Sequence, residues 1–483
     1  MRSCSWLTAL SVLCLVSLFS CKEKPPEPHP NILLILADQW RGQATGYAGD
    51  GNVKTPNIDR LAAISADLGN AVSGLPVCTP YRASLMTGQR PLTNGVFMND
   101  VMLDTSALTL AEVLAQNGYQ TGLIGKWHLD GQYRLKYTPP GPRRQGFQYW
   151  KAVNCDHQYN HSVYYFNDDT TLHYWQGYDA IAETQSAKQY LDDHKNTGKP
   201  FFLMLSWGPP HAPYHTAPEK YTEMYDSADI KLRPNVPDSM QGRARYDLAG
   251  YYAHMSALDD MVGELIAKLK EDGLFDNTII VFTSDHGDLL GSHGHYKKQR
   301  PYDECIRVPL LIHYSGQDSI KNGLYKAMSN AEDIMPTLLG LSHVAIPGTV
   351  EGVDLSSYLR GRVADPKDTV AIITCIQPFG QWTRAEGGKE MRGIRTPNYT
   401  YVCDLNGPWL LFDDASDPYQ MDNLIGNPAY AAVQQKLDQV LQQKLKDTHD
   451  EFKPGAYYVK KFNYPALDST GTVPYFFDGK WHM

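Results

Sequence analysis

The sequence predicts an α/β fold in which helices cover both faces of a large, mostly parallel sheet. Four apolar runs are hydrophobic at every position rather than at alternate positions, as expected of strands buried on both faces. Helical patterns lie between these runs, and strand alternating with helix is the order of an α/β protein. The length of 483 residues exceeds what one compact core holds, so we also expect a second, smaller unit.

The elements of the larger unit can be placed by residue number. The predicted strands cover residues 31–37, 121–125, 200–207 and 277–284. The predicted helices cover residues 55–66, 108–118 and about 246–273. In the first helix Thr55 is the expected cap and Pro56 begins the first turn. The third helix has apolar residues at helical spacing along most of its length.

The pattern of apolar and turn-forming residues changes after residue 365. Short β-like segments, separated by Gly, Pro and Asp, cover residues 369–376, 399–405 and 409–413, and a helix follows at about 428–448. This pattern predicts a large domain over residues 30–365 and a smaller α+β subdomain with an antiparallel sheet over residues 366–483.

The N-terminus has the pattern of an export signal. Arg2 precedes an apolar run that is too short for a transmembrane helix, which predicts a signal peptide over residues 1–20. Leu18 to Cys21 resembles a bacterial lipobox, and a polar, Pro-rich tether follows to residue 29. We therefore expect a lipidated Cys21 that anchors the protein to the membrane of a bacterial cell envelope, on its periplasmic or outer face. A plain secreted protein is the alternative.

Charge and cysteine usage narrow the class of partner. A net charge of -9 argues against a nucleic-acid partner, but it leaves room for a local site that binds an anion. The cysteines outside the N-terminal segment are widely spaced and contain no CxxC pair, which argues against a zinc cluster. Because their number is odd, at least one lacks an intramolecular partner, and a disulfide among the others stays open; they are Cys78, Cys155, Cys305, Cys375 and Cys403.

Ionisable groups follow each of the four predicted strands at once. In parallel α/β sheets the carboxyl ends of the strands meet at one edge, where sites form. Asp38 and Asp285 would supply carboxylate oxygens to a divalent cation there, Gln39 an amide oxygen and His286 a nitrogen. Considered without the other groups, the two aspartates would more readily be explained as capping residues.

Cationic side chains surround the same predicted edge. Lys126 and His128 follow the second strand, His211 follows the third, and Lys298 and Arg82 come from nearby segments. A metal ringed by positive charge suits a doubly charged tetrahedral oxyanion, which is the chemistry of a sulfate or phosphate ester.

One cysteine stands at the start of a short predicted helix. Pro80 favours a first turn, and Gly88 ends the pattern. Cys78 then lies at the helix N-terminus, where the dipole favours a thiolate or another nucleophile that attacks an anionic ester. The residues alone leave four readings: a buried thiol, half of a disulfide, a metal ligand or the precursor of a catalyst.

The segment CTPYRASLMTGQ, residues 78–89, resembles the signature of the type I, formylglycine-dependent sulfatases. The start of the first domain, GKWHL, HAP, the SDHGD segment and LFDDASDPYQMDNL resemble further blocks of that family in the right order. The resemblance covers roughly residues 30–425. It implies the alkaline-phosphatase-like sulfatase fold, with a large mixed sheet sandwiched by helices.

The resemblance also implies a nucleophile and a metal site. Cys78 would be converted to formylglycine by a formylglycine-generating or sulfatase-maturating enzyme, and one hydroxyl of the hydrated aldehyde would attack sulfur. Arg82 would hold the diol oxygens. The implied metal ligands are Asp38, Gln39, Asp285, His286 and the converted residue 78.

The remaining implied roles concern charge and protons. Lys126 and Lys298 would bind sulfate oxygens, and His211, with Lys298, would protonate the leaving alcohol. His128 would take the proton of the second hydroxyl, so that the aldehyde re-forms and sulfate leaves. A serine alcohol could not complete this last step without attack by water.

Two positions depart from the common sulfatase pattern. Many members have Asp-Asp where this chain has Asp38-Gln39, and Asp-Asn where it has Asp285-His286. We expect calcium, which prefers oxygen ligands, with manganese or magnesium as alternatives. Formylglycine-dependent phosphonate and phosphodiester hydrolases also tolerate Gln and His, but the Lys126 and His128 pair and the signal peptide favour a sulfatase.

A polar, aromatic insertion over residues 130–177 is the expected substrate pocket. Its rings suit sugar faces, and its histidines suit sulfate or hydroxyl groups, although packing against the sheet explains any single residue equally well. The candidates are His157, His161, His173 and Trp175. His157 and His161 could also be read as a metal pair, but no third ligand is evident.

The expected substrate is a sulfated carbohydrate. Galactan or glycosaminoglycan fragments are the first choice of substrate, with galactose or N-acetylgalactosamine sulfate slightly preferred. A pseudo-enzyme that binds sulfated glycan without cleaving it is an alternative of another class. Binding alone does not require a convertible cysteine, so the intact Cys78 signature argues against it.

Overall fold

The computed structural model describes residues 29–364, 366 and 369–482. The predicted signal peptide, Cys21 and nearly all of the predicted tether lie outside the described residues. Within the described part of the chain, no helix is both long enough and apolar enough to cross a membrane.

A ten-stranded sheet forms the centre of the molecule, with the strand order β11-β2-β10-β9-β1-β8-β4-β5-β6-β7. Its four central strands are the predicted ones and run parallel: β9 Thr278–Ser284, β1 Asn31–Asp38, β8 Phe201–Pro210 and β4 Gln120–Lys126. The sheet is mixed because β10 pairs antiparallel with β9, and β6 and β7 form an antiparallel ribbon at the other edge. The other strands are β2 Ala66–Asp67, β5 Tyr149–Val153, β6 Val163–Phe166, β7 Asp169–Tyr174, β10 Leu310–His313 and β11 Gly323–Leu324.

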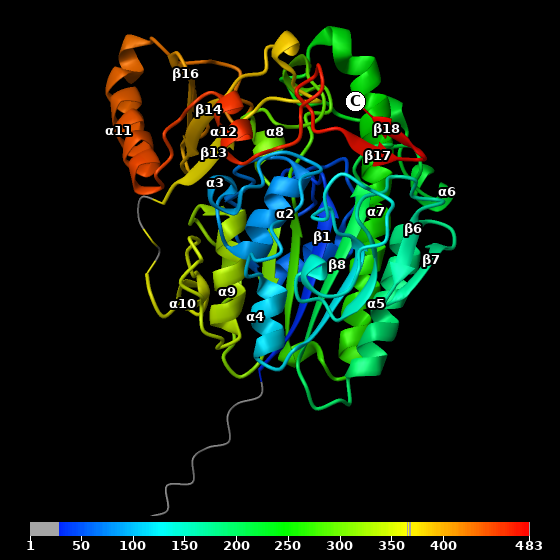
Figure 1. The fold of residues 1–483 in the computed structure, drawn as a ribbon. Coiled ribbons are helices and arrows are strands. Elements are labelled where there is room, and N and C mark those ends of the chain that lie inside the picture. Colours follow the sequence, from blue (N-terminus) through cyan, green and yellow to red (C-terminus); the bar gives the residue numbers. More distant parts are fainter. Residues whose placement is uncertain (1–28, 365, 367–368, 483) are drawn as a thin grey trace, which may run out of the picture.

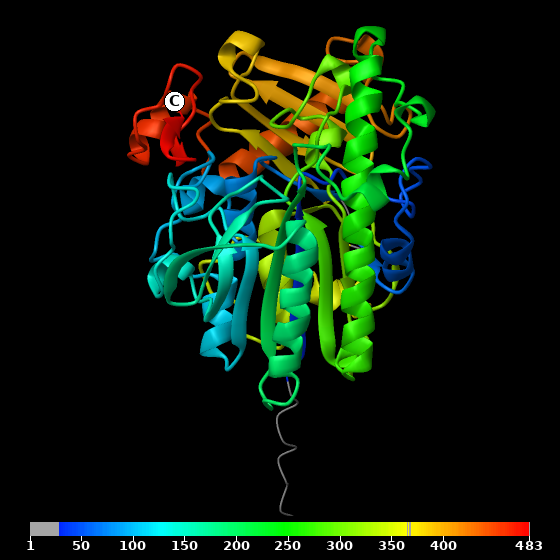
Figure 2. The same ribbon diagram turned by 90° about the vertical axis from the view of Figure 1, so that its right-hand side faces the viewer.

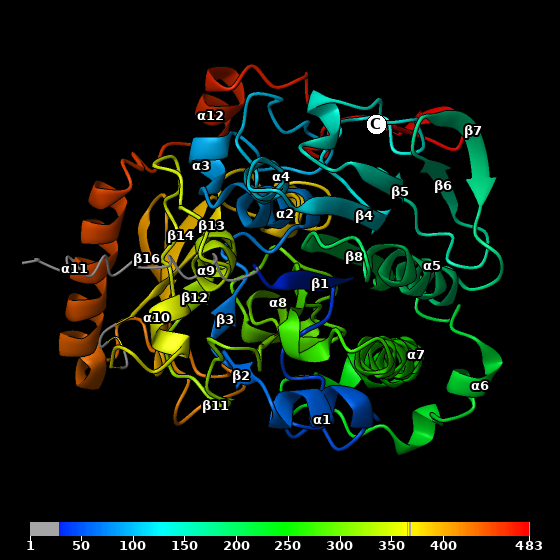
Figure 3. The ribbon, with the colours of Figure 1, turned by 90° about the horizontal axis from the view of Figure 1, so that it is seen from below.

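Helices cover both faces of this sheet (Figure 1 and Figure 3). One layer contains α1 Pro56–Ala63, α5 Asp179–His194 and α7 Gln241–Glu271; the other contains α2 Cys78–Thr87, α4 Leu110–Gln116 and α9 Ile334–Leu341. Along β1, successive side chains enter opposite cores: Ile32 and Leu34 pack in one, and Leu33 and Ile35 in the other. This double burial is the physical reason for the continuous hydrophobic run, and it confirms the predicted fold class.

The first helix is capped differently from the prediction. Thr55 occupies the N-cap position, but its side chain makes no capping hydrogen bond. Instead, the Asp259 carboxylate of α7 accepts the backbone N–H groups of Asn57 and Ile58 at 2.7–3.1 Å. Thr55 is thus the N-cap residue as predicted, but the capping hydrogen bonds come from Asp259. The Thr55 hydroxyl accepts from Gly46 N and donates to a side chain of its own helix.

A four-stranded antiparallel sheet lies above the carboxyl ends of the main strands (Figure 2). Its strands are β13 Ala371–Cys375, β14 Met391–Arg395, β15 Tyr399–Asp404 and β16 Gly407–Asp413. The helix α11, Ala431–Asp447, packs on it through Leu437, Leu441 and Leu445. The predicted small subdomain is thus confirmed in type, although β14 was not predicted, and the boundary at residue 365 stays a prediction.

A C-terminal tail (residues 462–482) follows α12, Gly455–Lys461. It ends in an unpredicted hairpin of β17, Tyr475–Phe477, and β18, Lys480–His482, which lies on the opposite side of the molecule from α11 (Figure 1). The remaining short elements are β3 Ala71–Val72, β12 Ser329–Asn330, α3 Pro91–Asn94, α6 Glu219–Thr222, α8 Asp303–Ile306 and α10 Ser356–Leu359.

The cap supplied by Asp259 makes a testable difference to stability. We expect Asp259→Ala to lower the free energy of unfolding by about 2 kcal/mol, because the buried N–H groups at the start of α1 lose their acceptor. Urea unfolding of both proteins measures it. The neighbouring Asp260→Ala removes an exposed pair with Lys220 and a hydrogen bond from the Tyr221 hydroxyl, and it should cost about 1 kcal/mol, less than Asp259→Ala. Equal losses in the two variants would contradict the assignment.

Candidate active site

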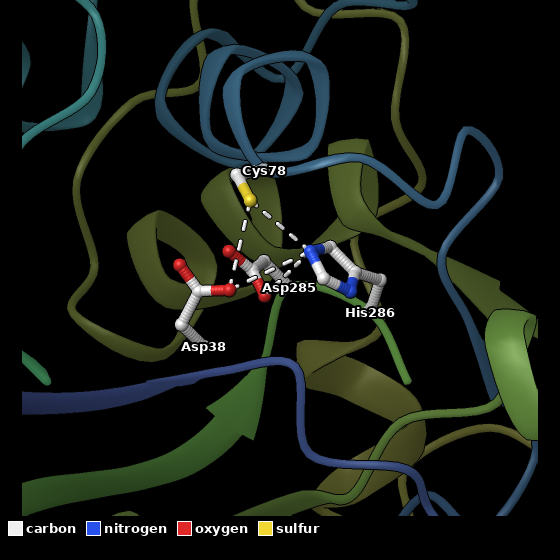
Figure 4. A group of neighbouring side chains, drawn as sticks. All are labelled: Asp38, Cys78, Asp285 and His286. Carbon is white, nitrogen blue, oxygen red and sulfur yellow. Dashed lines mark hydrogen bonds and ion pairs between the residues drawn. The ribbon is translucent and has the colours of Figure 1, made fainter. Parts of the chain in front are cut away.

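Four side chains converge where the central strands end (Figure 4). Asp38 is the last residue of β1, Asp285 and His286 follow β9, and Cys78 is the first residue of α2. One ligand atom from each lies within 4.8 Å of the other three. All four residues are buried. The predicted strand-end cluster is therefore present.

The helix α2 places Cys78 over this strand edge. It begins at Cys78, after the extended residue Val77, and ends at Gly88 in the left-handed conformation, as predicted. Every residue of the helix is buried. In the part of the chain that the structure describes, all five cysteines are free thiols, so the disulfide reading of Cys78 is excluded.

Positive groups surround the Cys78 thiol. Its Sγ lies 3.2 Å from His286 Nε2 and 3.6 Å from Asp38 Oδ1, and Lys298 Nζ donates to it at 3.3 Å. Burial and Asp38 would raise the pKa of Cys78, but Lys126, Lys298 and His286 hold that pKa well below its usual value. These positive groups thus stabilise a negatively charged atom at the position from which a nucleophile would act.

Arg82 lies one helical turn after Cys78 and contacts both site carboxylates. Its Nε donates to Asp285 at 3.2 Å, and an Nη lies 3.5 Å from Asp38. The other Nη donates to Ser206 Oγ at 2.7 Å and to the backbone oxygen of Lys126 at 3.1 Å. Arg82 therefore holds the carboxylates in place. Its implied hold on diol oxygens stays a prediction.

Gln39 is oriented by both of its amide atoms. Its Nε2 donates to Asp288, and its Oε1 accepts from Lys298 Nζ at 3.0 Å. Its backbone N–H donates to Asp285 at 3.0 Å from a left-handed conformation with φ 69°. The amide oxygen is thus turned toward Lys298. Asp288, to which the sequence assigned no role, fixes this orientation.

The donor set fits a divalent cation. Two fully buried carboxylates face one another at neighbouring strand ends, and such a pair needs positive partners. Asp38, Asp285 and Gln39 supply hard oxygen atoms, and His286 supplies a nitrogen. These four residues would hold the ion, with residue 78 beside it.

His128 belongs to a hydrogen-bonded group at one side of the site. Its Nε2 lies 3.4 Å from Asp100 Oδ1, and Arg134 donates to both oxygens of Asp100 at 2.8 and 2.7 Å. Burial would lower the pKa of His128, but Cys155 and the bond to Asp100 raise it to about 10. His128 is therefore positively charged at neutral pH. No sequence pattern marked Asp100 or Arg134 as part of the site.

His211 lies on the other side of the site, and its pKa is shifted in the opposite direction from that of His128. Its ring stacks on His157 at 4.3 Å between centroids, and His157 Nε2 lies 3.3 Å from Lys126 Nζ. The Nδ1 of His211 lies 2.8 Å from the Ala212 carbonyl oxygen, so Nδ1 donates and Nε2 is left to exchange a proton. Burial, followed by Lys298 and His157, holds the pKa of His211 well below its usual value.

A cleft of about 410 Å³ opens over Cys78. Its lining includes the predicted residues Cys78, His128, His157, His211 and Lys298. It also includes residues that the sequence analysis did not select: Asn99, Asp100, Arg134, Gln299, Phe379, Gly380, Gln381, Asp468, Thr470, Thr472, Tyr475 and His482. The last five belong to the C-terminal tail, and the Asp478-Gly479 turn of its hairpin was the sequence signal that could have revealed it.

Three predicted pocket residues do not line this cleft. His161 stacks on Tyr174 at 4.4 Å, and His173 stacks on Tyr164 at 5.2 Å. Trp175 is buried against Tyr164 and the helix layer of α5 and α7. The structure thus does not bring these three residues to the cleft over Cys78, and their role in binding substrate stays a prediction. Only His157 of that group lines the cleft.

Comparison with known proteins decides the family. Residues 30–344 match the family described as Sulfatase, and residues 291–447 match the C-terminal region of N-sulphoglucosamine sulphohydrolase. The chain belongs to the sulfatase family. It is therefore a sulfuric ester hydrolase, and membership implies a formylglycine made from the cysteine of the signature together with a divalent metal. Both matches end before the C-terminal tail of this sulfatase.

Relatives extend the likeness over nearly the whole sulfatase chain. An ulvan-active sulfatase of Formosa agariphila is 44% identical over 97% of this chain and 93% of its own. A solved structure of a Bacteroides fragilis protein described as a sulfatase has a TM-score of 0.81 at 32% identity, covering 91% of this chain and 99% of its own. Another, in complex with its substrate D-glucosamine-2-N,6-O-disulfate, has a TM-score of 0.76 at 25% identity, covering 88% and 99%.

The predicted metal site can be tested through stability. A cation that binds only the folded sulfatase should raise the melting temperature, with a stabilisation of about 2.7 kcal/mol when its concentration is 100 times Kd. Asp285→Asn should remove most of this gain, because one carboxylate ligand is lost. Calorimetric melting with and without calcium measures it. Asp130→Asn changes a buried carboxylate outside the ligand set and should retain the gain; loss in both variants would contradict the assignment.

Proposed function

We propose that this sulfatase removes O-sulfate groups from saccharides of sulfated polysaccharides, such as galactan, ulvan or glycosaminoglycan fragments. The observation that carries the proposal is the cleft over Cys78, whose lining includes buried cationic groups and exposed polar groups. Lys298 and His128 are buried, whereas Thr470 and Gln381 are exposed and Asp468 lines the cleft with them. This arrangement suits a sulfate that enters first, attached to a hydroxyl-rich sugar. The relatives named for ulvan and for a glucosamine sulfate support it.

The bound cation is proposed to be calcium. Three of the four donors are oxygen atoms, and calcium accepts oxygen ligands in flexible geometry. The nitrogen of His286 keeps manganese and magnesium as competing ions, to be compared in the same melting experiment. When bound, the cation supplies positive charge that stabilises a deprotonated oxygen at residue 78.

The formylglycine made from Cys78 supplies, once hydrated, one hydroxyl that attacks sulfur and a second whose deprotonation restores the aldehyde and releases sulfate. The residues of this chain provide the rest. Lys298 lies 3.3 Å from the Cys78 Sγ position, where it can hold a sulfate oxygen and offset its charge. Lys126 lies between Asp38 and His157 and contributes a second positive charge.

Two histidines divide the proton transfers. His211 would donate from Nε2 to the departing alcohol oxygen. Its lowered pKa means that it gains this proton only when an anion occupies the cleft and offsets Lys298 and His157. His128, on the opposite side and hydrogen-bonded to Asp100, would mediate removal of the proton from the second hydroxyl. Because its pKa is raised, His128 must first release its own proton to solvent before it can accept the proton of the hydroxyl.

The remaining proposals concern the maturation and the location of the protein. A formylglycine-generating or sulfatase-maturating enzyme would convert Cys78, and a lipid on Cys21 would anchor the mature protein at the bacterial envelope. Polysaccharide fragments are then met outside the cytoplasmic membrane. The alternative activity is that of a formylglycine-dependent phosphonate monoester or phosphodiester hydrolase.

The proposed activity is tested by measuring the hydrolysis of sulfated oligosaccharides, of a reference aryl sulfate and of a phosphonate monoester that carries the same aryl group. We expect the sulfate esters to be hydrolysed faster, and Cys78→Ala to lose at least 10³-fold in kcat, because the nucleophile is absent. Mass spectrometry of the peptide carrying residue 78 provides the control: conversion lowers its mass by the difference between a thiol and an aldehyde. Faster phosphonate turnover, or activity in Cys78→Ala, would overturn the proposal.

The role of His211 predicts a dependence on the leaving group. For His211→Ala we expect kcat/KM to fall about 10²-fold or more on a sulfated sugar, because an alkoxide leaves poorly without a proton. The loss should shrink steadily along a series of aryl sulfates with increasingly acidic phenols. Steady-state kinetics on that series measures the slope. A uniform loss across the series would instead assign His211 to binding.

A further inference from the structure

The C-terminal tail is attached to the loop that carries Arg134. Phe476 of β17 pairs with this loop through its backbone: its N–H donates to Gln132 O at 2.8 Å, and its carbonyl accepts from Arg134 N at 3.0 Å. The Gln132 side chain donates to Pro474 O as well. The backbone of Arg134 is therefore held by a segment that is more than 300 residues away in the sequence and that neither family match covers.

The side chain of Arg134 is held by the same hairpin. Its guanidinium carbon lies 3.5 Å from the centre of the Tyr475 ring, and His482 stacks on that ring at 5.0 Å with an interplanar angle of 5°. Such a cation over an aromatic face is attractive and restricts the planar guanidinium to one orientation. In that orientation its fork donates to both oxygens of Asp100.

Asp100 in turn contacts both the proton-transfer group and the nucleophile helix. Its Oδ1 lies 3.4 Å from His128 Nε2, and its backbone N–H donates to Thr79 Oγ1, next to Cys78, at 3.4 Å. Asp100 and His128 both adopt left-handed backbone conformations, with φ of 62° and 59°. Residues that are not glycine keep such conformations only where their surroundings hold them.

We propose that the C-terminal tail positions His128 for its proton transfer: Tyr475 holds Arg134, Arg134 holds Asp100, and Asp100 orients the His128 imidazole. Tyr475, Arg134 and Asp100 are thus positioning residues that act through His128. All four line the cleft, so the connection is continuous from the tail to the reacting centre. This inference rests on the proposed role of His128, and it makes a segment outside the family matches part of the machinery for releasing sulfate.

Truncation of Tyr475 tests the connection. On 4-nitrophenyl sulfate, a substrate too small to need saccharide contacts, we expect Tyr475→Ala to lower kcat about tenfold. His128 acts after the phenol has left, so KM should fall in parallel and kcat/KM should stay within twofold. Stopped-flow mixing should show a burst of nitrophenol before a slower steady state. Tyr475→Phe retains the ring, and the Tyr475 hydroxyl has no hydrogen-bond partner in the described part of the chain, so this variant should match wild type.

A double-mutant cycle separates positioning from general weakening. Asp100→Asn alone should lower kcat, and adding Tyr475→Ala to it should cost less than a further twofold, because the connection is already broken. In the Cys78→Ala protein, the histidine ¹⁵N spectrum should show the His128 resonance shifted by Tyr475→Ala. This readout does not depend on conversion of Cys78.

Trp481→Ala is the matched control. Trp481 belongs to the same hairpin, is 46% exposed and contacts Tyr133 and Phe476. We expect it to leave kcat unchanged. Equal losses in Trp481→Ala and Tyr475→Ala, full additivity in the cycle, or wild-type kinetics in Tyr475→Ala would each overturn the inference. If His128→Ala itself kept its kcat, the proposed role of His128 would fail instead.

Discussion

The active site depends on two carboxylates that are removed from water at neighbouring strand ends. Asp38 and Asp285 are fully buried, and an uncompensated buried charge costs several kcal/mol. Burial opposes ionisation of Asp38, but the positive charges of Lys126, Lys298 and Arg82 hold its pKa well below the usual value. For Asp285, burial and the nearby Asp38 charge raise the pKa. The pair therefore needs cations from the protein and, beyond them, a metal.

This requirement explains where the helix α2 lies. Arg82 can reach both carboxylates only if the first turn of α2 stands directly over the ends of β1 and β9. Cys78 is four residues earlier on that helix, which is about one turn, so the arginine that neutralises the carboxylates also brings the nucleophile position to the metal site. The complete burial of α2 leaves it no alternative position. The same placement of α2 therefore both neutralises the carboxylates and positions the nucleophile.

The sequence predicted those parts of the site that follow from local pattern. A continuous apolar run marks a strand with both faces buried, and its end marks the edge where Asp38 and Asp285 meet. Contacts between distant segments left no such mark. Asp259 caps α1 from about 200 residues away, so Thr55 looked like a sufficient cap. In the 130–177 insertion, composition suggested a pocket, but of the candidates chosen from it only His157 lines the cleft; His173 lies opposite Tyr164 through the pairing of β6 with β7, which the sequence pattern did not reveal.

The two sides of the cleft differ in how they are built. Lys126 ends β4 and His211 follows β8 directly, so the large sheet fixes their positions, and Lys298 joins them from the loop between β9 and α8. The opposite side is assembled from the loop that carries Arg134 and a hairpin of six paired residues. A short hairpin contributes little to the stability of the core, so its residues can vary at small cost in folding free energy. Variation in the tail is therefore limited by the connection from Tyr475 through Arg134 and Asp100 to His128 rather than by folding stability.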